Sequence, residues 1–252
     1  MRHIRFVDPR SGEPRTGRIE GEWIGTHAQK QRLEDVELLS PCVPSKIVCV
    51  GRNYVDHATE LGNDVPTQPL LFLKPPSAVI GPGAAIVLPE SDTVHYEAEL
   101  AVVIGRRCRN VKAAESADVI LGYTCLNDIS DRMAQQWETN WVRAKAFDTS
   151  APLGPAIVSP EELTFPLDIE LRLNGAVRQK ASTADMIFSV PRLIETITSF
   201  MTLEPGDVIA TGTPAGVGAL SAGDLVEVEI QGIGTLRNPV LGPTFRETKR
   251  SE

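Results

Sequence analysis

Cysteines and long apolar segments are scarce in this sequence, and each shortage excludes a class of protein. The four cysteines among its 252 residues form no C-x-x-C pair and show no zinc-ligand spacing. We therefore expect small core residues in a reducing compartment at Cys42, Cys49, Cys108 and Cys125. No apolar run is long enough to span a membrane, and residues 1–10 lack the apolar stretch of a secretory signal, so a cytoplasmic location is expected.

Positive charge is also in short supply. The chain has 25 Lys and Arg against 33 Asp and Glu, which gives a formal charge of -8, and the basic residues form no cluster. Because nucleic-acid binding needs clustered basic side chains, no nucleic-acid partner is expected. An acidic protein can still bind an acidic small molecule where a bound cation supplies local positive charge.

Common nucleotide and nucleophile motifs are absent too. There is no G-x-S-x-G segment and no Walker sequence. The segment G-T-P-A-G-V-G at 212–218 leads into a turn rather than a helix, which argues against a dinucleotide site.

What is present is a chain of frequent short strands. With 42% hydrophobic residues the chain can bury a sizeable core, and we expect a main domain at 45–252 after a small β-rich domain at 1–44. Asn174-Gly175 predicts a tight hairpin, residues 191–201 a helix with Ser189 as its cap, and residues 57–61 a short helix. These features favour an α+β fold dominated by a mixed, mostly β-sheet that is rolled on itself.

Two glutamates stand side by side in one of these strands. Residues 94–104 read V-H-Y-E-A-E-L-A-V-V-I, and this alternation places Glu97 and Glu99 on one face. Such a pair either faces water, as Glu227 and Glu229 would in V-E-V-E-I, or binds a hard cation. Asp128 follows a mostly apolar strand-length run and is placed like a third ligand; three carboxylates suit Mg²⁺ or Mn²⁺ better than zinc.

Other residues have chemical potential but have ordinary explanations as well. His57 and Glu60 stand three apart, so on a helical turn the carboxylate could orient the imidazole for general base catalysis, or the two could form a simple surface pair. Lys145 could bind a substrate carboxylate or enolate, although a lone lysine is more often at the surface. His95 shares a face with Glu97, yet an exposed or partner-holding histidine is the more common case.

Eight segments of this chain, in order and with matching spacing, resemble the blocks of the fumarylacetoacetate hydrolase family. The likeness extends from about residue 46 to residue 240. The blocks are G-R-N-Y-V-D-H-A-T-E-L-G, P-L-L-F-L-K-P, H-Y-E-A-E-L-A-V-V-I-G, L-N-D-I-S-D-R, A-K-A-F-D-T, N-G-A-V-R-Q, M-I-F-S-V-P and G-D-V-I-A-T-G-T-P-A-G-V-G. Eight blocks in sequence are far more specific than any single motif.

The resemblance implies a role for each candidate residue. It implies a Mg²⁺ or Mn²⁺ site at Glu97, Glu99 and Asp128, and catalytic roles for His57, Glu60 and Lys145. Substrate contacts are implied for Arg132, Gln135 and Thr213.

The family's chemistry implies a small oxo-acid substrate and a homodimer. Its members act on 2-oxo or 2-hydroxydienoate acids, and a bound cation would stabilise the enolate formed when a neighbouring bond breaks. The candidate catalytic residues resemble those of acylpyruvases, whereas the segment Q-W-E-T-N-W-V at 136–142 looks more like the isomerase or decarboxylase branch. This mixture leaves three reactions open: C–C hydrolysis, isomerisation, and decarboxylation, including that of oxaloacetate. A scaffold that has lost activity is the non-enzymatic alternative.

Overall fold

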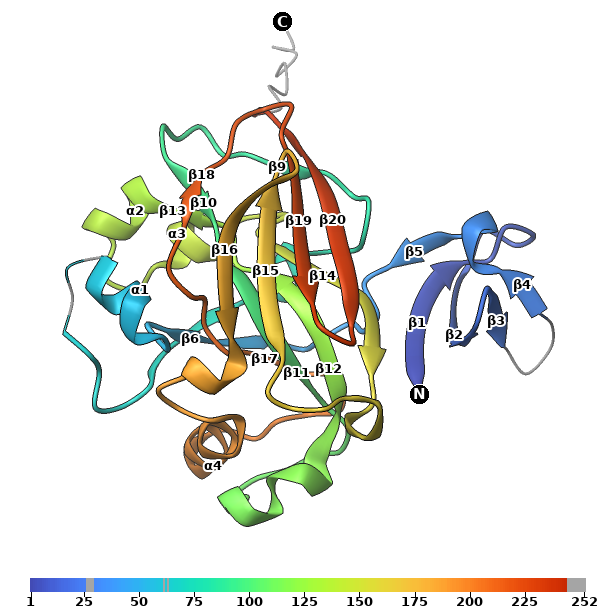
Figure 1. Ribbon diagram of the computed structural model, residues 1–252, viewed down its shortest axis with the longest axis horizontal. Helices are drawn as coiled ribbons and strands as arrows, with labels where there is room; N and C mark the ends of the chain where they lie inside the picture. The colour runs from blue at the N-terminus through green and yellow to red at the C-terminus, as the bar shows by residue number, and fades with distance from the viewer. Residues whose placement is uncertain (26–29, 61, 63, 244–252) are drawn as a thin grey trace, which may run out of the picture.

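A computed structural model describes residues 1–25, 30–60, 62 and 64–243. Within these residues the chain forms three sheets and few helices, with a small lobe beside the main body (Figure 1). The fold is therefore the mostly β, mixed-sheet α+β class that the sequence predicts.

The largest sheet has 12 strands in the order β4-β3-β2-β1-β14-β12-β11-β17-β6-β7, with β5 beside β1 and β8 beside β14. It is mixed, because β17 and β6 run parallel while β11 pairs antiparallel with both β12 and β17. Its strands are β1 (Arg2–Val7), β2 (Pro14–Glu20), β3 (Trp23–Gly25), β4 (Lys30–Arg32), β5 (Glu37–Leu39), β6 (Ile47–Gly51), β7 (Leu70–Lys74), β8 (Val79–Ile80), β11 (Ala98–Ile104), β12 (Ile120–Asn127), β14 (Ala151–Val158) and β17 (Val208–Ala210).

A second sheet of five strands lies across the first and contributes the other half of the core. Its order is β16-β15-β19-β20-β9, and a sheet of three strands, β13-β10-β18, completes the body. Their bounds are β9 (Ile86–Val87), β15 (Asp168–Leu173), β16 (Ala176–Ser182), β19 (Leu225–Ile230), β20 (Gly234–Leu241), β10 (Val94–Tyr96), β13 (Ser130–Asp131) and β18 (Gly218–Ala219). The predicted hairpin joins β15 to β16, with positive φ at both Asn174 and Gly175.

The helices are short and lie around the sheets. They are α1 (Val55–Glu60), α2 (Arg132–Trp137), α3 (Val142–Lys145) and α4 (Val190–Phe200), with 3₁₀ turns at Leu33–Asp35, Pro76–Ala78, Ala113–Val119, Pro160–Glu162 and Thr183–Asp185. The predicted helix at 191–201 is α4, and Ser189 occupies its N-cap position, although its side chain makes no capping hydrogen bond. The predicted helix at 57–61 corresponds to α1; residue 61 is outside the described residues.

Apolar side chains from both large sheets form the main core. Leu100 and Val102 of β11 pack in one buried cluster with Leu171 of β15, Val228 of β19 and Leu193 of α4. All seven residues of β11 are buried, which explains why this strand reads as a nearly continuous apolar run after its acidic start. Glu99 thus lies in a strand that is buried along its whole length.

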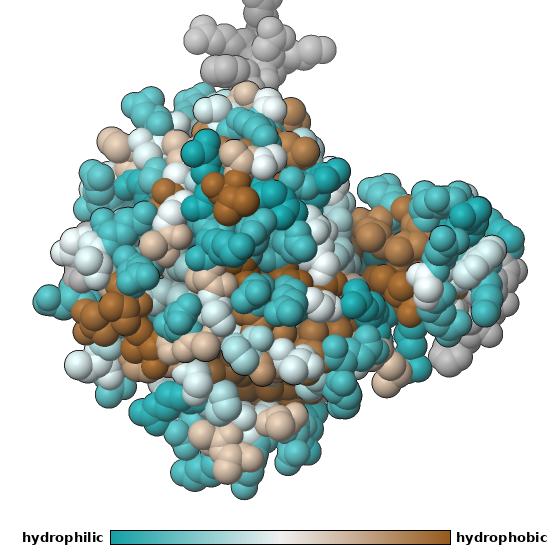
Figure 2. All heavy atoms as spheres, in the orientation of Figure 1, coloured by the Kyte–Doolittle hydropathy of each residue, from teal (hydrophilic) through white to brown (hydrophobic). Residues whose placement is uncertain are grey.

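The N-terminal strands β1–β5 form the lobe at one side of the body (Figure 1). A small cluster of Ile4, Phe6 and Ile24 packs there against Ala156 of β14. The side of this lobe that looks toward the body carries apolar side chains, whereas most of the face in view is hydrophilic (Figure 2). The domain boundary expected at residue 44 falls between β5 and β6.

The four cysteines are free and buried, as the sequence predicts. Within the described ranges, none of the helices is long and apolar enough to cross a bilayer.

Candidate metal and substrate site

Three carboxylates predicted as metal ligands come together in the body. One ligand oxygen from each of Glu97, Glu99 and Asp128 lies within 4.8 Å of the others, and all three side chains are buried. Glu97 lies at the break between β10 and β11, Glu99 is in β11, and Asp128 directly follows β12, which pairs with β11. The Asp128 amide donates to the Glu97 carbonyl oxygen at 2.8 Å, so the strand pairing itself fixes the three groups as neighbours.

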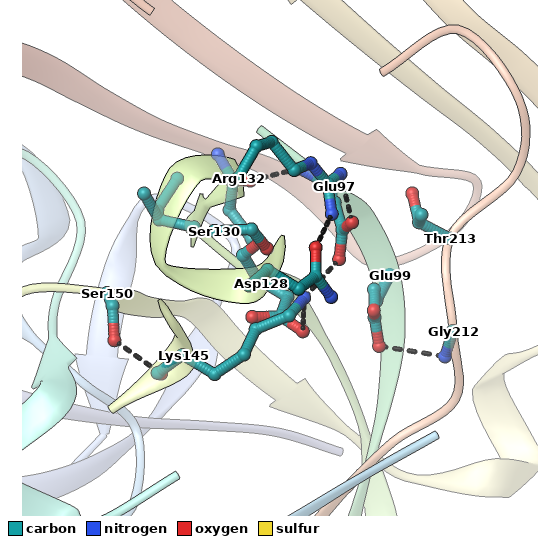
Figure 3. A network of polar contacts seen from close by, with 12 residues as sticks. Glu97, Glu99, Asp128, Ser130, Arg132, Lys145, Ser150, Gly212 and Thr213 are labelled. Atoms are coloured by element: carbon teal, nitrogen blue, oxygen red, sulfur yellow. Dashed lines mark hydrogen bonds and ion pairs between the residues drawn. The ribbon is translucent and has the colours of Figure 1, made fainter. Parts of the chain in front are cut away.

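Cationic side chains surround two of these carboxylates (Figure 3). Lys145 Nζ lies 2.7 Å from Glu97 Oε2 and 2.8 Å from Asp128 Oδ2. Arg132 donates one terminal N–H to the other oxygen of Glu97 and another to Gln135 Oε1 at 2.8 Å. Glu99 accepts a hydrogen bond from the Gly212 amide at 2.8 Å, and no described cationic side chain contacts it.

The pKa values of the carboxyls follow these contacts. Burial opposes ionisation of Glu97, but the charges of Lys145 and Arg132 outweigh it and hold the pKa of Glu97 well below its usual range. Burial, together with the Asp128 and Glu97 charges, raises the pKa of Glu99 well above its ordinary value. Burial likewise disfavours the Lys145 ammonium, yet Asp128 and Glu97 raise the pKa of Lys145 overall.

This arrangement fits a hard divalent cation. The donor set consists of carboxylate oxygens, which Mg²⁺ and Mn²⁺ prefer. Glu99 lacks a cationic partner among the described residues, and an added cation would favour its ionised form. The second Glu-x-Glu pair shows the contrast: in β19, Glu229 pairs with Arg172 at 2.7 Å and Glu227 pairs with Arg237, so arginines already neutralise it.

The predicted dyad lies on α1 beside the same cavity. His57 is 3% exposed, and its Nδ1 lies 3.2 Å from Glu60 Oε2. The Gly216 amide donates to Glu60 at 3.1 Å and so holds the carboxylate against the loop after Thr213. Because the carboxylate contacts Nδ1, the other ring nitrogen of His57 remains available for proton transfer.

Thr213 is placed by a residue that sequence reasoning left without a role. Gln179 of β16 donates to Thr213 Oγ1 and to the Pro214 carbonyl oxygen, both at 2.8 Å, and accepts from the Ala98 amide at 2.9 Å. This side chain therefore ties the five-stranded sheet to β11 and to the Thr213 loop. Its signal in the sequence was the N-G-A-V-R-Q block, whose glutamine follows the hairpin turn.

A cavity of about 490 Å³ joins these residues into one site. Of the nine candidate residues, all except Glu60 line it, and Glu60 reaches it through His57. The other lining residues are Val50, Gly51, Arg52, Phe72, Thr93, His95, Gln136 and Trp141. His95 is thus a partly buried residue of the cavity wall, and its Nδ1 has no hydrogen-bond partner among the described residues.

Lys74 is a further charged residue of the site, and no sequence pattern singles it out. It is fully buried at the end of β7, and its Nζ lies 2.8 Å from Asp128 Oδ1. The same nitrogen donates to the carbonyl oxygens of Ile129, Lys145 and Ser150 and to Ser150 Oγ, at 2.5–3.1 Å. Lys74 therefore holds the carboxylate oxygen of Asp128 that Lys145 does not contact.

The family model of the fumarylacetoacetate hydrolase C-terminal domain matches residues 46–241. The chain belongs to this family. It is 43% identical over 223 residues to oxaloacetate tautomerase YisK of Bacillus subtilis, and the matched region covers 82% of this chain and 69% of that protein.

Solved structures of family members share the fold closely. The 5-carboxymethyl-2-hydroxymuconate delta-isomerase of Mycobacterium smegmatis is 43% identical with a TM-score of 0.90, over 97% of this chain and all of that one. The maleylpyruvate hydrolase of Sphingobium sp. SYK-6, in complex with manganese(II) and pyruvate, is 34% identical with a TM-score of 0.81, over 97% and 100% of the two chains. Relatives of this chain are therefore enzymes that tautomerise, isomerise or hydrolyse.

Proposed function

We propose that this protein is a divalent-metal-dependent enzyme that enolises a small 2-oxo acid, with isomerisation or tautomerisation as its outcome. The observation that carries the proposal is the buried triad of Glu97, Glu99 and Asp128 in one cavity with His57. The manganese and pyruvate in the related hydrolase support both the metal and the 2-oxo acid. The similarity to a tautomerase and an isomerase, each 43% identical, favours proton transfer over C–C hydrolysis.

In this proposal Glu97, Glu99 and Asp128 hold Mg²⁺ or Mn²⁺. When bound, the cation would act as a Lewis acid on the 2-oxo group and stabilise the developing enolate. Arg132 and Lys145 keep Glu97 ionised and so ready to act as a ligand. Lys74 holds Asp128 in position through its ion pair with Asp128 Oδ1.

The protein's own side chains would orient the substrate and move the proton. Thr213, held by Gln179, and Gln135, held by Arg132, present polar groups for the substrate oxygens. His57 takes the proton from the carbon next to the 2-oxo group through the ring nitrogen that Glu60 does not contact, while Glu60 stabilises the imidazolium. It returns this proton to the enolate oxygen in tautomerisation, or to another carbon of the conjugated system in isomerisation. Burial of the site keeps water from competing for that proton.

C–C hydrolysis is the second candidate, favoured by the related maleylpyruvate hydrolase. It would use the same dyad to activate water instead of accepting a carbon-bound proton.

Purified protein assayed with oxaloacetate and with an acylpyruvate, with Mg²⁺, Mn²⁺ or EDTA, tests the proposal. We expect metal-dependent keto–enol exchange of oxaloacetate that Asp128→Asn abolishes and Glu60→Gln slows. Pyruvate formation measured in the same reactions reports decarboxylation or hydrolysis. If metal-loaded wild-type protein turned over none of these acids, the inactive scaffold would be the better description.

A further inference from the structure

Arg52 lies on the wall of the cavity in an unusual backbone conformation. It directly follows β6, whose last residues Val50 and Gly51 also line the cavity, and its side chain is partly buried. Its φ is 58°, in the left-handed region that arginine rarely adopts. Glycine or asparagine would satisfy this turn with less strain, so the local structure does not explain why an arginine is found here.

The next residue, Asn53, holds the turn in place. Its side chain donates to the Thr211 carbonyl oxygen at 2.7 Å and to that of Phe188 at 3.0 Å, and accepts from the Phe188 amide at 2.7 Å. Its carbonyl oxygen accepts from the Ile187 amide at 2.8 Å. These bonds overdetermine the conformation without help from the Arg52 side chain, which is therefore available for another task.

The guanidinium of Arg52 is a positive charge in the cavity that no described side chain neutralises. Among the residues that the structure describes, it has no hydrogen-bond or ion-pair partner. By contrast, the terminal nitrogens of Arg132 donate to Glu97 and Gln135, and the ammonium of Lys145 donates to Glu97 and Asp128. A guanidinium keeps its charge at all physiological pH values and matches a carboxylate in two parallel hydrogen bonds.

A charge count shows what this cation would bind. The three triad carboxylates are balanced by three cationic contacts, from Lys74, Lys145 and Arg132. The two charges of a divalent ion would be balanced by the carboxylate and enolate oxygen of a 2-oxo acid. Arg52 then adds one positive charge to the same cavity, and a second substrate carboxylate would balance it.

We propose that Arg52 binds the distal carboxylate of the substrate, so that the site selects 2-oxo dicarboxylic acids over monocarboxylic ones. This inference rests on the proposed function, because it assigns the 2-oxo end of the substrate to the triad. It adds a specificity residue that acts at the opposite end of the molecule from the metal ligands.

Binding of two matched ligands tests the inference without turnover. N-oxalylglycine and N-ethyloxamate present the same chelating oxalyl group, and only the first carries a distal carboxylate. In calorimetric titrations of Mg²⁺-loaded wild-type protein, we expect N-oxalylglycine to bind about tenfold or more tightly than N-ethyloxamate, as a charge-assisted contact gives. Arg52→Asn should bring the two affinities together and leave that for N-ethyloxamate unchanged, whereas Arg52→Lys should keep part of the preference.

Controls separate this effect from general damage. Arg106→Asn removes an exposed arginine that pairs with Asp118 at 3.8 Å, and it should keep the wild-type preference. Asparagine is chosen at position 52 because it accepts a positive φ; should Arg52→Asn lose its circular dichroism signal, Arg52→Gly repeats the measurement.

The possible outcomes are distinct. An unchanged preference in Arg52→Asn, or equal weakening of both ligands, would overturn the role of Arg52. Wild-type protein that binds N-ethyloxamate but shows no preference would also overturn it, while the proposed function would stand. If neither ligand bound the metal-loaded wild-type protein, the proposed function would fail as well.

Discussion

Replacing Lys74 by methionine tests the electrostatic support of the site most directly. The substitution keeps the length of the side chain but removes an ammonium that is fully buried and 2.8 Å from Asp128. Four further acceptors, three of them carbonyl oxygens, lose the hydrogen bond from Lys74. Asp128 would keep Lys145 as its remaining cationic contact among the described residues.

Breaking a buried ion pair from one side typically costs about 3–5 kcal/mol. Burial lowers the pKa of Lys74 although the charge of Asp128 acts to raise it. The native protein is therefore already destabilised by burying this ammonium, and removing the ammonium relieves that part. We therefore expect the lower end, about 3 kcal/mol of the free energy of unfolding. For a chain of this size that corresponds to a melting temperature lower by about 6–12 °C.

Thermal and urea unfolding in EDTA measure this loss, with Lys180→Met as the matched control. Lys180 is 73% exposed and lies 3.7 Å from Glu170, so its replacement should cost less than about 1 kcal/mol. Added Mn²⁺ should raise the melting temperature of Lys74→Met more than that of wild type, because one cation that repels the metal is gone. A loss no larger than that of Lys180→Met would refute the reasoning.

Three further predictions concern metal affinity, pH and assembly. Lys145→Met should bind Mn²⁺ about tenfold or more tightly than wild type in calorimetry, because the wild-type ammonium occupies the space between Glu97 and Asp128. The variant should also lose turnover. Mn²⁺ binding weaker than that of wild type would contradict this prediction. Although burial opposes ionisation of Asp207, hydrogen bonds from the Glu204 amide, Lys46 and Ser45 lower its pKa. The ionised carboxylate should thus contribute its full stabilisation above the unfolded pKa of about 3.9, and this contribution should fade as pH falls through the lower folded pKa. In urea unfolding, the free energies of Asp207→Asn and wild type should converge as pH falls below about 4. A difference between them that stayed constant with pH would exclude this linkage. The expected homodimer predicts a sedimentation mass twice that of the 27.3 kDa chain, and a single-chain mass at micromolar concentration would exclude it.

Local pattern was enough to predict much of the fold. The hairpin at Asn174-Gly175 forms because Asn and Gly both tolerate the positive φ values that a type I′ turn between twisted strands requires. The helix α4 forms where apolar residues recur at helical spacing behind a proline in the first turn. Alternation in residues 94–104 and the position of Asp128 after an apolar run predicted three neighbouring carboxylates, which the structure brings together. The spacing of His57 and Glu60 offered a dyad or a surface pair, and the resemblance to a family implied the roles of all five residues.

Pattern alone separated the two Glu-x-Glu pairs only by Asp128, which is placed like a third ligand for the first pair; tertiary structure supplied the physical difference between them. Glu227 and Glu229 received arginine partners from neighbouring strands, whereas Glu99 was buried beside Glu97 and Asp128 with no cationic partner among the described residues. Lys74 could not be selected either, because its ion pair with Asp128 joins residues 54 positions apart in the sequence.

The same holds for Arg52, a cavity residue whose guanidinium has no partner among the residues that the structure describes. Local preferences act between residues a few positions apart, so they set which short segments become strands, turns and helices. Neutralisation of the site's charges depends on side chains brought together from distant strands in a site of low dielectric constant, and it emerges only from the folded arrangement.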